Sequence, residues 1–392
     1  MTAAKPKHIL IITYNDYPVY EGLGVRIRNM ARVLIENGHQ VSIYAPNIEH
    51  LRPVSEWVDG VRIVRSNIFV PGFLKRNRVV ARTYSMVLQF FLSLLAYLRH
   101  FRGRKIDLII SAHIYSIPAA IVLRGCSGAK IYVDDIITVA DALRDAGYRS
   151  LVGVFTAFER LLFRFCTEFI YTSETSRRYY LERGATPRIY LPNGVNCDEF
   201  TVKATLNAKK VVFFNGSTYS TQNTAAAENF IQIGRELMQQ GQTAFRFKLV
   251  CWPKYYLPAA VQEALVTESS WLEFEEGVEK IENEIAKADI VLLPYNAGHH
   301  LSGGVRLKAL EYMAASKMLI STEEGVEGIS GLLHGEHFWL AEDISAVPSL
   351  IATILQSPTE MERMAKNARI HVQNHYDWRT TMVELIARIQ QN

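Results

Sequence analysis

Metal-binding and redox motifs are missing from this chain of 392 residues. Its four cysteines, Cys126, Cys166, Cys197 and Cys251, are scattered and form no CxxC pair and no Cys/His spacing. This pattern argues against a structural zinc site and predicts a reducing compartment, the cytoplasm. No run of about 18 apolar residues occurs, and the polar start leads directly into an apolar segment, so we expect neither a spanning helix nor a secretory leader.

Low-complexity stretches and short-period repeats are missing as well. Hydrophobic residues make up 49% of the chain and charged residues 21%, a globular composition long enough for two domains. Short apolar segments alternate with helical patterns, which predicts α/β architecture with doubly wound parallel sheets. The predicted strands fall into two series that meet near residues 192–209: 8–14, 40–46, 61–66, 107–113, 130–136 and 168–174, then 209–217, 245–252, 271–278, 289–296 and 317–325.

Acidic residues are absent between Val61 and Ile106, although the whole chain carries a net charge of only +4. The cations of this stretch are Arg62, Arg65, Lys75, Arg76, Arg78, Arg82, Arg99, Arg102, Arg104 and Lys105. Between them the run SMVLQFFLSLLAYL is too short to span a bilayer but suits its surface, so peripheral membrane contact through residues 62–105 is one interpretation. A core helix whose apolar face packs on the sheet while its arginines face water is the other. Without a recognisable binding module, nucleic acid is not expected as a partner.

The run GGVRLKALEYMA, residues 303–314, is the strongest candidate for a binding site. Residues 289–296 predict a buried strand and residues 305–315 a helix, which leaves Gly303 and Gly304 at the helix N-terminus, where backbone N–H groups attract phosphate. Arg306 and Lys308 follow in the first turns and could neutralise a pyrophosphate without metal. Glu311, eight residues after Gly303, lies roughly 12 Å from it along the helix axis. A nucleotide that lies along the helix would place its ribose hydroxyls there. A surface helix with an ordinary charged face is the alternative.

Five further segments, in order along the chain, resemble a known family. They are residues 8–47, residues 171–200 with the turn PNGV, ADIVLLPYN before the glycine run, STEEGVEGI after it, and NHYDW near the end. Together with GGVRLKALEYMA they make the chain similar to family 4 glycosyltransferases of the GT-B fold. This resemblance implies two Rossmann-like domains facing a cleft: an acceptor-side domain at 1–195, a nucleotide-sugar-binding domain at 196–375, and a C-terminal helix at 376–392 that returns to the first domain.

The resemblance also implies the activity and the site residues. We expect a hexosyltransferase-type enzyme that moves a sugar from a nucleotide diphosphate sugar to a glycan or lipid-linked acceptor, with retention and without a metal or other cofactor. It would be cytoplasmic and peripheral on the inner face of the cell membrane. Catalytic candidates are Arg306, Lys308 and His113; donor-binding candidates are Gly22, Gly24, Asn215, Gly216, Ser217, Gly303, Gly304, Val305 and Glu311; acceptor-side candidates are Arg26, Asp134 and Asp135.

Two departures from the family pattern limit this mechanism. The family commonly has a Glu-x7-Glu pair, but Gly303 stands eight residues before Glu311. The family also often has an Arg/Lys pair after the first strand of the second domain, and here no cation occurs between Lys210 and Arg235. We therefore expect Arg306 and Lys308 to stabilise the leaving group, together with the backbone of residues 215–217. A sugar-nucleotide epimerase, a phosphorylase and a non-catalytic partner subunit stay open as alternatives.

Overall fold

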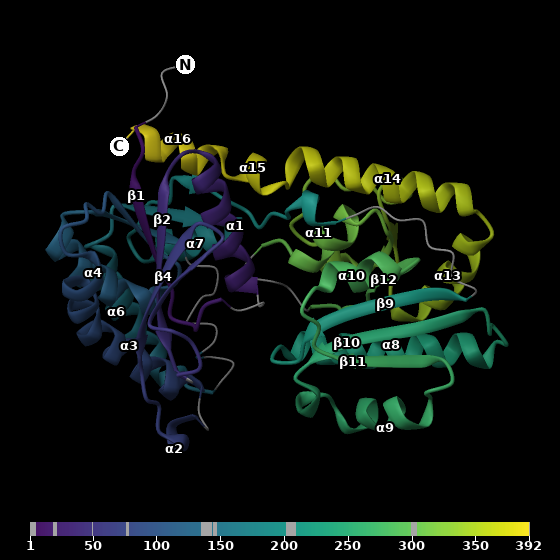
Figure 1. Cartoon of the computed structure of the whole chain (residues 1–392). Helices are drawn as coiled ribbons and strands as arrows, with labels where there is room; N and C mark the ends of the chain where they lie inside the picture. Colours follow the sequence, from purple (N-terminus) through teal and green to yellow (C-terminus); the bar gives the residue numbers. More distant parts are fainter. Residues whose placement is uncertain are drawn as a thin grey trace. The chain divides into compact units, whose positions relative to one another are not determined.

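The computed structural model describes residues 5–18, 22–48, 50–75, 78–134, 143, 147–200, 209–298 and 304–391 (Figure 1). The chain divides into two compact units. Unit 1 comprises Met1–Pro192, Ser302–Gly304 and Thr381–Asn392, and unit 2 comprises Asn193–Leu301 and Val305–Thr380. The end of the chain thus groups with its beginning.

Unit 1 is built on one sheet with the order β3-β4-β2-β1-β5-β6-β7-β8. Its strands are β1 (His8–Ile12), β2 (Gln40–Asn47), β3 (Ser55–Val58), β4 (Val61–Asn67), β5 (Leu108–Ser111), β6 (Lys130–Asp134), β7 (Glu168–Tyr171) and β8 (Ile189–Tyr190). Only the β3–β4 pair is antiparallel among these described strands. The central strand β1 is buried at all five positions, as expected for a parallel strand covered on both faces.

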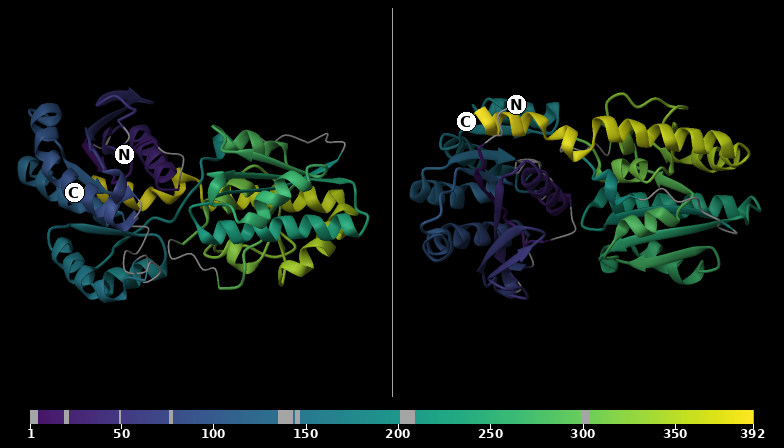
Figure 2. Two further views of the ribbon diagram at one scale, coloured as in Figure 1. Left: turned by 90° about the horizontal axis from the view of Figure 1, so that it is seen from below. Right: turned by 45° about the horizontal axis from the view of Figure 1, so that its top comes forward.

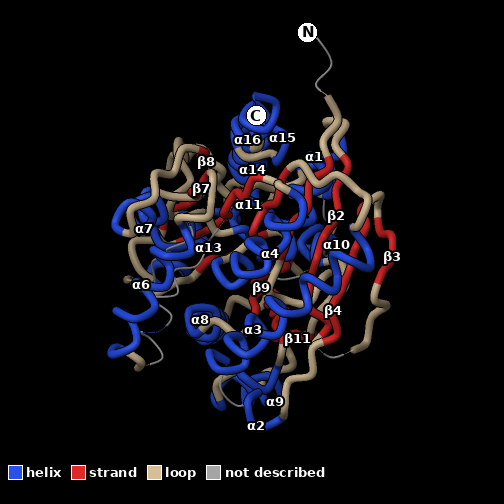
Figure 3. The backbone as a smooth tube through the Cα atoms, turned by 90° about the vertical axis from the view of Figure 1, so that its left-hand side faces the viewer, coloured by secondary structure: helices blue, strands red, loops and turns tan. Residues whose placement is uncertain are grey.

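Helices cover both faces of this sheet. They are α1 (Gly22–Glu36), α2 (Gly72–Lys75), α3 (Arg78–Ala96), α4 (Ile117–Ser127), α6 (Val152–Phe163), α7 (Glu174–Glu182) and α16 (Val383–Gln391). Helices α3, α4 and α6 lie on one side of the strands and α1 on the other (Figure 1), and Figure 3 shows those three helices in front of the strands of their sheet. The yellow helix α16 lies near the start of the chain (Figure 2), where Lys7 Nζ donates a hydrogen bond of 2.5 Å to the carbonyl oxygen of Ile389.

Unit 2 has a wholly parallel sheet with the order β11-β10-β9-β12-β13-β14. Its strands are β9 (Lys210–Ser217), β10 (Phe245–Trp252), β11 (Leu272–Glu276), β12 (Ile290–Leu293), β13 (Met318–Ser321) and β14 (Trp339–Leu340). Its helices are α8 (Thr221–Gln239), α9 (Ala259–Thr267), α10 (Ile281–Lys287), α11 (Leu307–Ala314), α12 (Glu323–Val326), α13 (Val347–Leu355), α14 (Pro358–His375) and α15 (Trp378–Thr381), whose last residue belongs to unit 1.

The predicted fold class, two α/β units with parallel sheets, is confirmed, and every predicted strand is present. The sequence analysis missed the short edge strands β3, β8 and β14, which are too brief for a periodic pattern. It also placed the start of one helix too early: α11 begins at Leu307, and Arg306 is its N-cap residue in an extended conformation. None of the described helices is long and apolar enough to cross a membrane.

Candidate functional site

A cluster of polar and aromatic side chains occupies the carboxyl ends of β9 and β12 in unit 2. Strand β9 ends in Asn215, Gly216 and Ser217, Tyr295 follows β12, and α11 begins nearby. In open parallel sheets this edge is where ligands bind, because the loops that follow the strands converge there. Both cations of the glycine run reach this edge.

Lys308 points from the first turn of α11 to the end of β9. Its Nζ donates a hydrogen bond of 2.9 Å to Asn223 Oδ1 and lies 4.8 Å from the ring centre of Phe214 and 5.6 Å from that of Tyr295. A Cβ atom on Gly216 would lie 3.2 Å from the same Nζ. The missing side chain at Gly216 therefore leaves room for the ammonium group, which sits over the faces of two aromatic rings.

Asn223, in the first turn of α8, holds this lysine in place. Its Oδ1 also accepts a hydrogen bond of 2.8 Å from the Tyr295 hydroxyl, and its Nδ2 donates one of 2.8 Å to the carbonyl oxygen of Ser217. All polar atoms of the amide are thus engaged, so its orientation is fixed. The sequence analysis missed Asn223 and Tyr295. The available signal for Asn223 was that polar residues follow β9 at the place where the family often has an Arg/Lys pair.

Arg306 is buried beside this cluster, with 7% of its surface exposed. Its Nε donates to the carbonyl oxygen of Glu324 at 2.8 Å, one Nη donates to Gln222 Oε1 at 3.1 Å, and its guanidinium carbon lies 3.8 Å from the ring centre of Tyr295. Burial lowers the pKa of Arg306, while Tyr295 and the nearby glutamates act in the opposite direction. The two hydrogen bonds orient the guanidinium, and Glu324 and Glu327 act on it electrostatically.

The same helix contributes Tyr312 and Glu311. The hydroxyl of Tyr312 donates to Asn215 Oδ1 at 2.6 Å and accepts from the backbone N–H of Asn215 at 3.1 Å. Burial raises the pKa of Tyr312 well above its usual value, so it stays a neutral donor. Glu311 is half-buried and follows Lys308 by three residues, which places both on one side of α11.

The approach to α11 is only partly within the described residues. Gly303 lies outside them, whereas Gly304 has φ +87°, a backbone conformation that favours glycine. Val305 is buried, and its carbonyl oxygen accepts a hydrogen bond of 2.9 Å from Asn193 Nδ2. The first turn of the helix therefore starts three residues after Gly304, and in it the Ala309 N–H donates to the carbonyl oxygen of Arg306 at 3.1 Å.

His113 lies at the carboxyl end of β5 in unit 1, as predicted from the sequence. The side chain is 2% exposed; its Nδ1 accepts a hydrogen bond of 3.2 Å from the backbone N–H of Tyr115. The imidazole centre lies 4.3 Å from the ring centre of Tyr14 and 5.0 Å from that of Tyr115. The histidine therefore forms part of an aromatic cluster at the strand end, and its catalytic role stays a prediction.

The acceptor-side candidates Arg26 and Asp134 form an ion pair with each other. Arg26 Nε donates to Asp134 Oδ2 at 2.8 Å and one Nη donates to Oδ1 at 2.7 Å, with both side chains wholly buried. The guanidinium also donates to the carbonyl oxygens of Leu191 and Pro192, at 2.9 and 3.3 Å. These contacts tie α1, β6 and the end of unit 1 together, while Asp135 lies outside the described residues.

The donor-binding candidates of unit 1, Gly22 and Gly24, lie at the start of a helix. Gly22 is the first residue of α1 and Gly24 is buried within its first turn, so both are helical rather than part of a loop. Because the side of a helix exposes no backbone N–H, only the N-terminal end of this turn can present such groups to a ligand.

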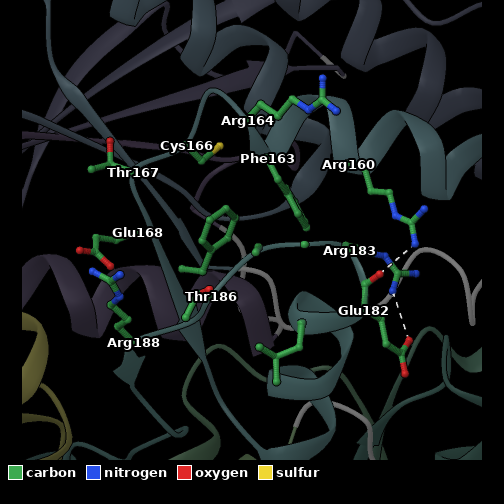
Figure 4. Close-up of a pocket in the computed structure, with 14 residues that line it drawn as sticks. Arg160, Phe163, Arg164, Cys166, Thr167, Glu168, Glu182, Arg183, Thr186 and Arg188 are labelled. Atoms are coloured by element: carbon green, nitrogen blue, oxygen red, sulfur yellow. Dashed lines mark hydrogen bonds and ion pairs between the residues drawn. The ribbon is translucent and has the colours of Figure 1, made fainter.

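A separate cavity of about 650 Å³ lies in unit 1 at the amino end of β7 (Figure 4). Arginines line it, among them Arg160, whose Nη donates to the carbonyl oxygen of Glu182 at 3.0 Å, and Arg183, which pairs with the buried Glu159. None of the candidate residues lines it. Across the described ranges, no three His, Cys, Asp or Glu side chains group so that they could hold a metal ion.

The two-unit α/β architecture and the cationic strand edge define a GT-B-type protein, and the sequence carries the same assignment. Residues 21–194 match the model of the glycosyl transferase 4-like domain, and residues 236–387 match the model of a glycosyl transferase-like family. The chain belongs to the GT-B glycosyltransferases of family 4. No curated protein matches it in sequence.

Solved structures share this fold over nearly the whole chain. Sucrose-phosphate synthase from Thermosynechococcus elongatus superposes with a TM-score of 0.75 at 17% identity, covering 98% of each chain. HepE of Anabaena in complex with UDP and glucose gives 0.68 at 12% identity, covering 98% of this chain and 99% of that one. An E. coli structure described as trehalose-6-phosphate bound with UDP-2-fluoro glucose gives 0.70 at 12% identity, with the same coverage.

Proposed function

We propose that the protein transfers a sugar from a nucleotide diphosphate sugar and that unit 2 binds the donor at the carboxyl ends of β9 and β12. The observation that carries this proposal is the pair of cations, Lys308 and Arg306, oriented at this edge by hydrogen bonds and aromatic faces. Solved neighbours of the same fold contain UDP or UDP-sugar ligands, which supports a nucleotide-sugar donor.

The chemistry requires stabilisation of negative charge. When the glycosidic bond to the nucleotide diphosphate breaks, the leaving phosphate gains charge while the sugar ring becomes positive. Lys308, Arg306 and the N-terminal amides of α11 supply fixed positive charge for this phosphate, which is the largest catalytic term in reactions of this kind. These groups need no metal ion to do so. Glu311, on the same side of α11 as Lys308, would accept hydrogen bonds from the ribose hydroxyls.

We extend the proposal to retention of the anomeric configuration, with the leaving phosphate taking the proton of the acceptor hydroxyl. The acceptor would be a glycan or a lipid-linked sugar, bound by unit 1. The protein would act on the cytoplasmic side of the cell membrane. Retention is tested by proton NMR of the product formed early in the reaction.

Donor hydrolysis and donor binding are the first tests of the activity. The purified protein is mixed with UDP-, GDP-, ADP- and dTDP-sugars, and release of each nucleotide diphosphate is measured. We expect one donor class to react, and Lys308→Ala to lower kcat by about a hundredfold, because one charged contact to the transition state is lost.

Lys366→Ala is the matched control, since Lys366 is an exposed lysine on α14 of the same unit. It should leave the rate unchanged. Binding of no nucleotide diphosphate sugar would refute the proposal. Inversion at C2 of the donor sugar without transfer would instead show an epimerase.

A further inference from the structure

Helix α3 buries several polar residues, together with Met86 and Ala96, and exposes large apolar ones. The polar residues Gln89 and Ser93 are buried, at 1% and 0% exposed, and Gln89 Nε2 donates a hydrogen bond of 2.9 Å to the carbonyl oxygen of Thr13, next to β1. The exposed residues are large and apolar instead. They continue into the π-helical turn Tyr97–Phe101 that follows the helix: Val87 44%, Phe91 66%, Leu94 47%, Leu95 57% and Leu98 51% exposed.

Steps of three or four residues connect the members of this set, so they form one continuous stripe along the helix. A stripe of this kind on the outside of a folded domain marks a surface that another apolar phase covers. The exposed stripe does not pack on the sheet, which favours the interpretation of this segment as a surface helix.

Exposed cations surround the stripe at its C-terminal end. Arg99, Arg102 and Arg104 are all exposed there, and Arg124 of α4 is exposed beside them. Lys105 is exposed too, but its Nζ pairs with Asp107 at 2.7 Å. The helices are joined at these ends: Tyr97 Oη donates to the carbonyl oxygen of Cys126 at 3.0 Å, and Arg124 donates to that of Phe165, just after α6.

The helices of the same face carry almost no negative charge. Within the described parts of α3, α4 and α6, the only acidic residue is Glu159, which is buried and paired with Arg183. Helix α6 adds the exposed apolar residues Val154 and Leu161. Arg65, by contrast, is a buried structural cation that donates to Tyr17 and Pro53 carbonyl oxygens and to Glu56, so it does not contribute to the surface.

We propose that this face of unit 1, formed by the outer sides of α3 and α6 and the cations at their C-terminal ends, docks on the surface of an anionic lipid bilayer. The apolar stripe enters the interface between headgroups and acyl chains, and the cations contact lipid phosphates. A second copy of the chain suits the face less well, since pairing two such faces would bring like charges together. The inference concerns a surface away from the donor site and does not depend on the proposed transfer reaction.

Co-sedimentation of the full chain with vesicles tests the proposal. One set of vesicles is phosphatidylcholine alone, and the other contains equal parts of phosphatidylcholine and phosphatidylglycerol. We expect binding to the anionic vesicles only, and weaker binding at higher salt because exposed charges are screened.

Two groups of variants separate the apolar and the electrostatic contributions. Phe91→Asp with Leu95→Asp should abolish sedimentation. Arg99→Glu, Arg102→Glu and Arg104→Glu together should weaken partitioning by at least a hundredfold, since each cation lost near an anionic surface costs roughly fivefold.

The controls carry the same substitutions elsewhere. Val266→Asp with Ile370→Asp, at exposed positions of α9 and α14, matches the apolar change, and Lys209→Glu, Arg246→Glu and Lys366→Glu match the change in net charge. Both should bind anionic vesicles as the wild type does. Circular dichroism of every variant shows that it is folded.

Equal binding to neutral vesicles, binding to neither, or equal loss in the controls would overturn the proposal. Self-association in gel filtration that Phe91→Asp abolishes, without vesicle binding, would assign the face to a second copy and overturn it as well. Donor hydrolysis is measured on the same samples, so a failure of vesicle binding is distinguished from a failure of the proposed activity.

Discussion

Replacement of Asp134 by alanine should destabilise unit 1 severely, because it leaves the guanidinium of Arg26 buried without a counter-ion. The carboxylate accepts two charge-assisted hydrogen bonds from Arg26 in a site where both side chains are 0% exposed. Removal of one member of such a pair costs about 3–5 kcal/mol. The carbonyl oxygens of Leu191 and Pro192 would still accept from the guanidinium but would not neutralise it.

Hydrogen exchange is the appropriate assay, since two units need not unfold in one step. Amides of β6 and α1 that exchange through opening of unit 1 should exchange about a hundred- to a few-thousandfold faster in Asp134→Ala, and amides of unit 2 should not change. The double variant Arg26→Met, Asp134→Leu removes both charges and should recover to within about 1 kcal/mol of the wild type.

The double variant also separates a structural role from an acceptor-binding role. If Asp134→Ala leaves the exchange of β6 and α1 unchanged but raises the acceptor KM, the pair is not a structural element and the reasoning from burial is wrong. Full recovery of exchange protection in the double variant together with a lost acceptor affinity would show that the two roles coexist.

Three other substitutions test the packing, the ionisation and the site of unit 2. Gly234→Ala should cost about 1–3 kcal/mol in thermal unfolding followed by tryptophan fluorescence, because its Cβ would lie 2.3 Å from a ring carbon of Trp271; unchanged stability would contradict this. Burial lowers the pKa of Lys317 to about 8 in the folded protein, whereas the unfolded chain has a lysine pKa of about 10.4. Between pH 8 and about 10.4 the unfolded chain therefore binds more protons at this lysine than the folded protein, and stability should rise with pH. Lys317→Met should remove that rise in urea unfolding and stabilise the protein at pH 7 by about 2 kcal/mol; an unaltered pH profile would refute the buried ammonium. Asn223→Ala should lower kcat for donor hydrolysis by about tenfold with little change in KM, since Lys308 loses its acceptor, and an effect on KM alone would argue against this positioning role.

The fold was predictable because strands and helices of this length leave a periodic pattern. Four of the five buried residues of β1 are consecutive and apolar, and such runs are typical of a parallel strand covered on both faces. Edge strands such as β8, of two residues, leave no pattern. The start of α11 was misplaced because Val305 is apolar and fits the helical period, although the backbone turns into the helix only after Arg306.

The cations of the candidate site were predictable, but the groups that orient them were not. Arg306 and Lys308 stand in a recognisable run, whereas Asn223 and Gln222 lie about 85 positions earlier and hold them through side-chain amides. Amides in the first turn of a helix are common and carry no spacing rule. The start of α8 and the start of α11 meet only in the folded protein, at one edge of the sheet, so these contacts needed the tertiary structure.

In helix α3 the side that the sequence pattern predicts to face solvent is the side that is buried in the structure. The positions of Gln89 and Ser93, four residues apart, would ordinarily mark the solvent side of an amphipathic helix, and the leucines and phenylalanines between them would mark the core. In the structure Gln89 satisfies a backbone carbonyl next to β1, and Phe91 and Leu95 face outward. If the apolar stripe packed on the sheet, the cations beside it would simply face water, as on any surface helix. Because the stripe is exposed, we expect Phe91→Asp to leave folding intact, a result that a core position would not allow.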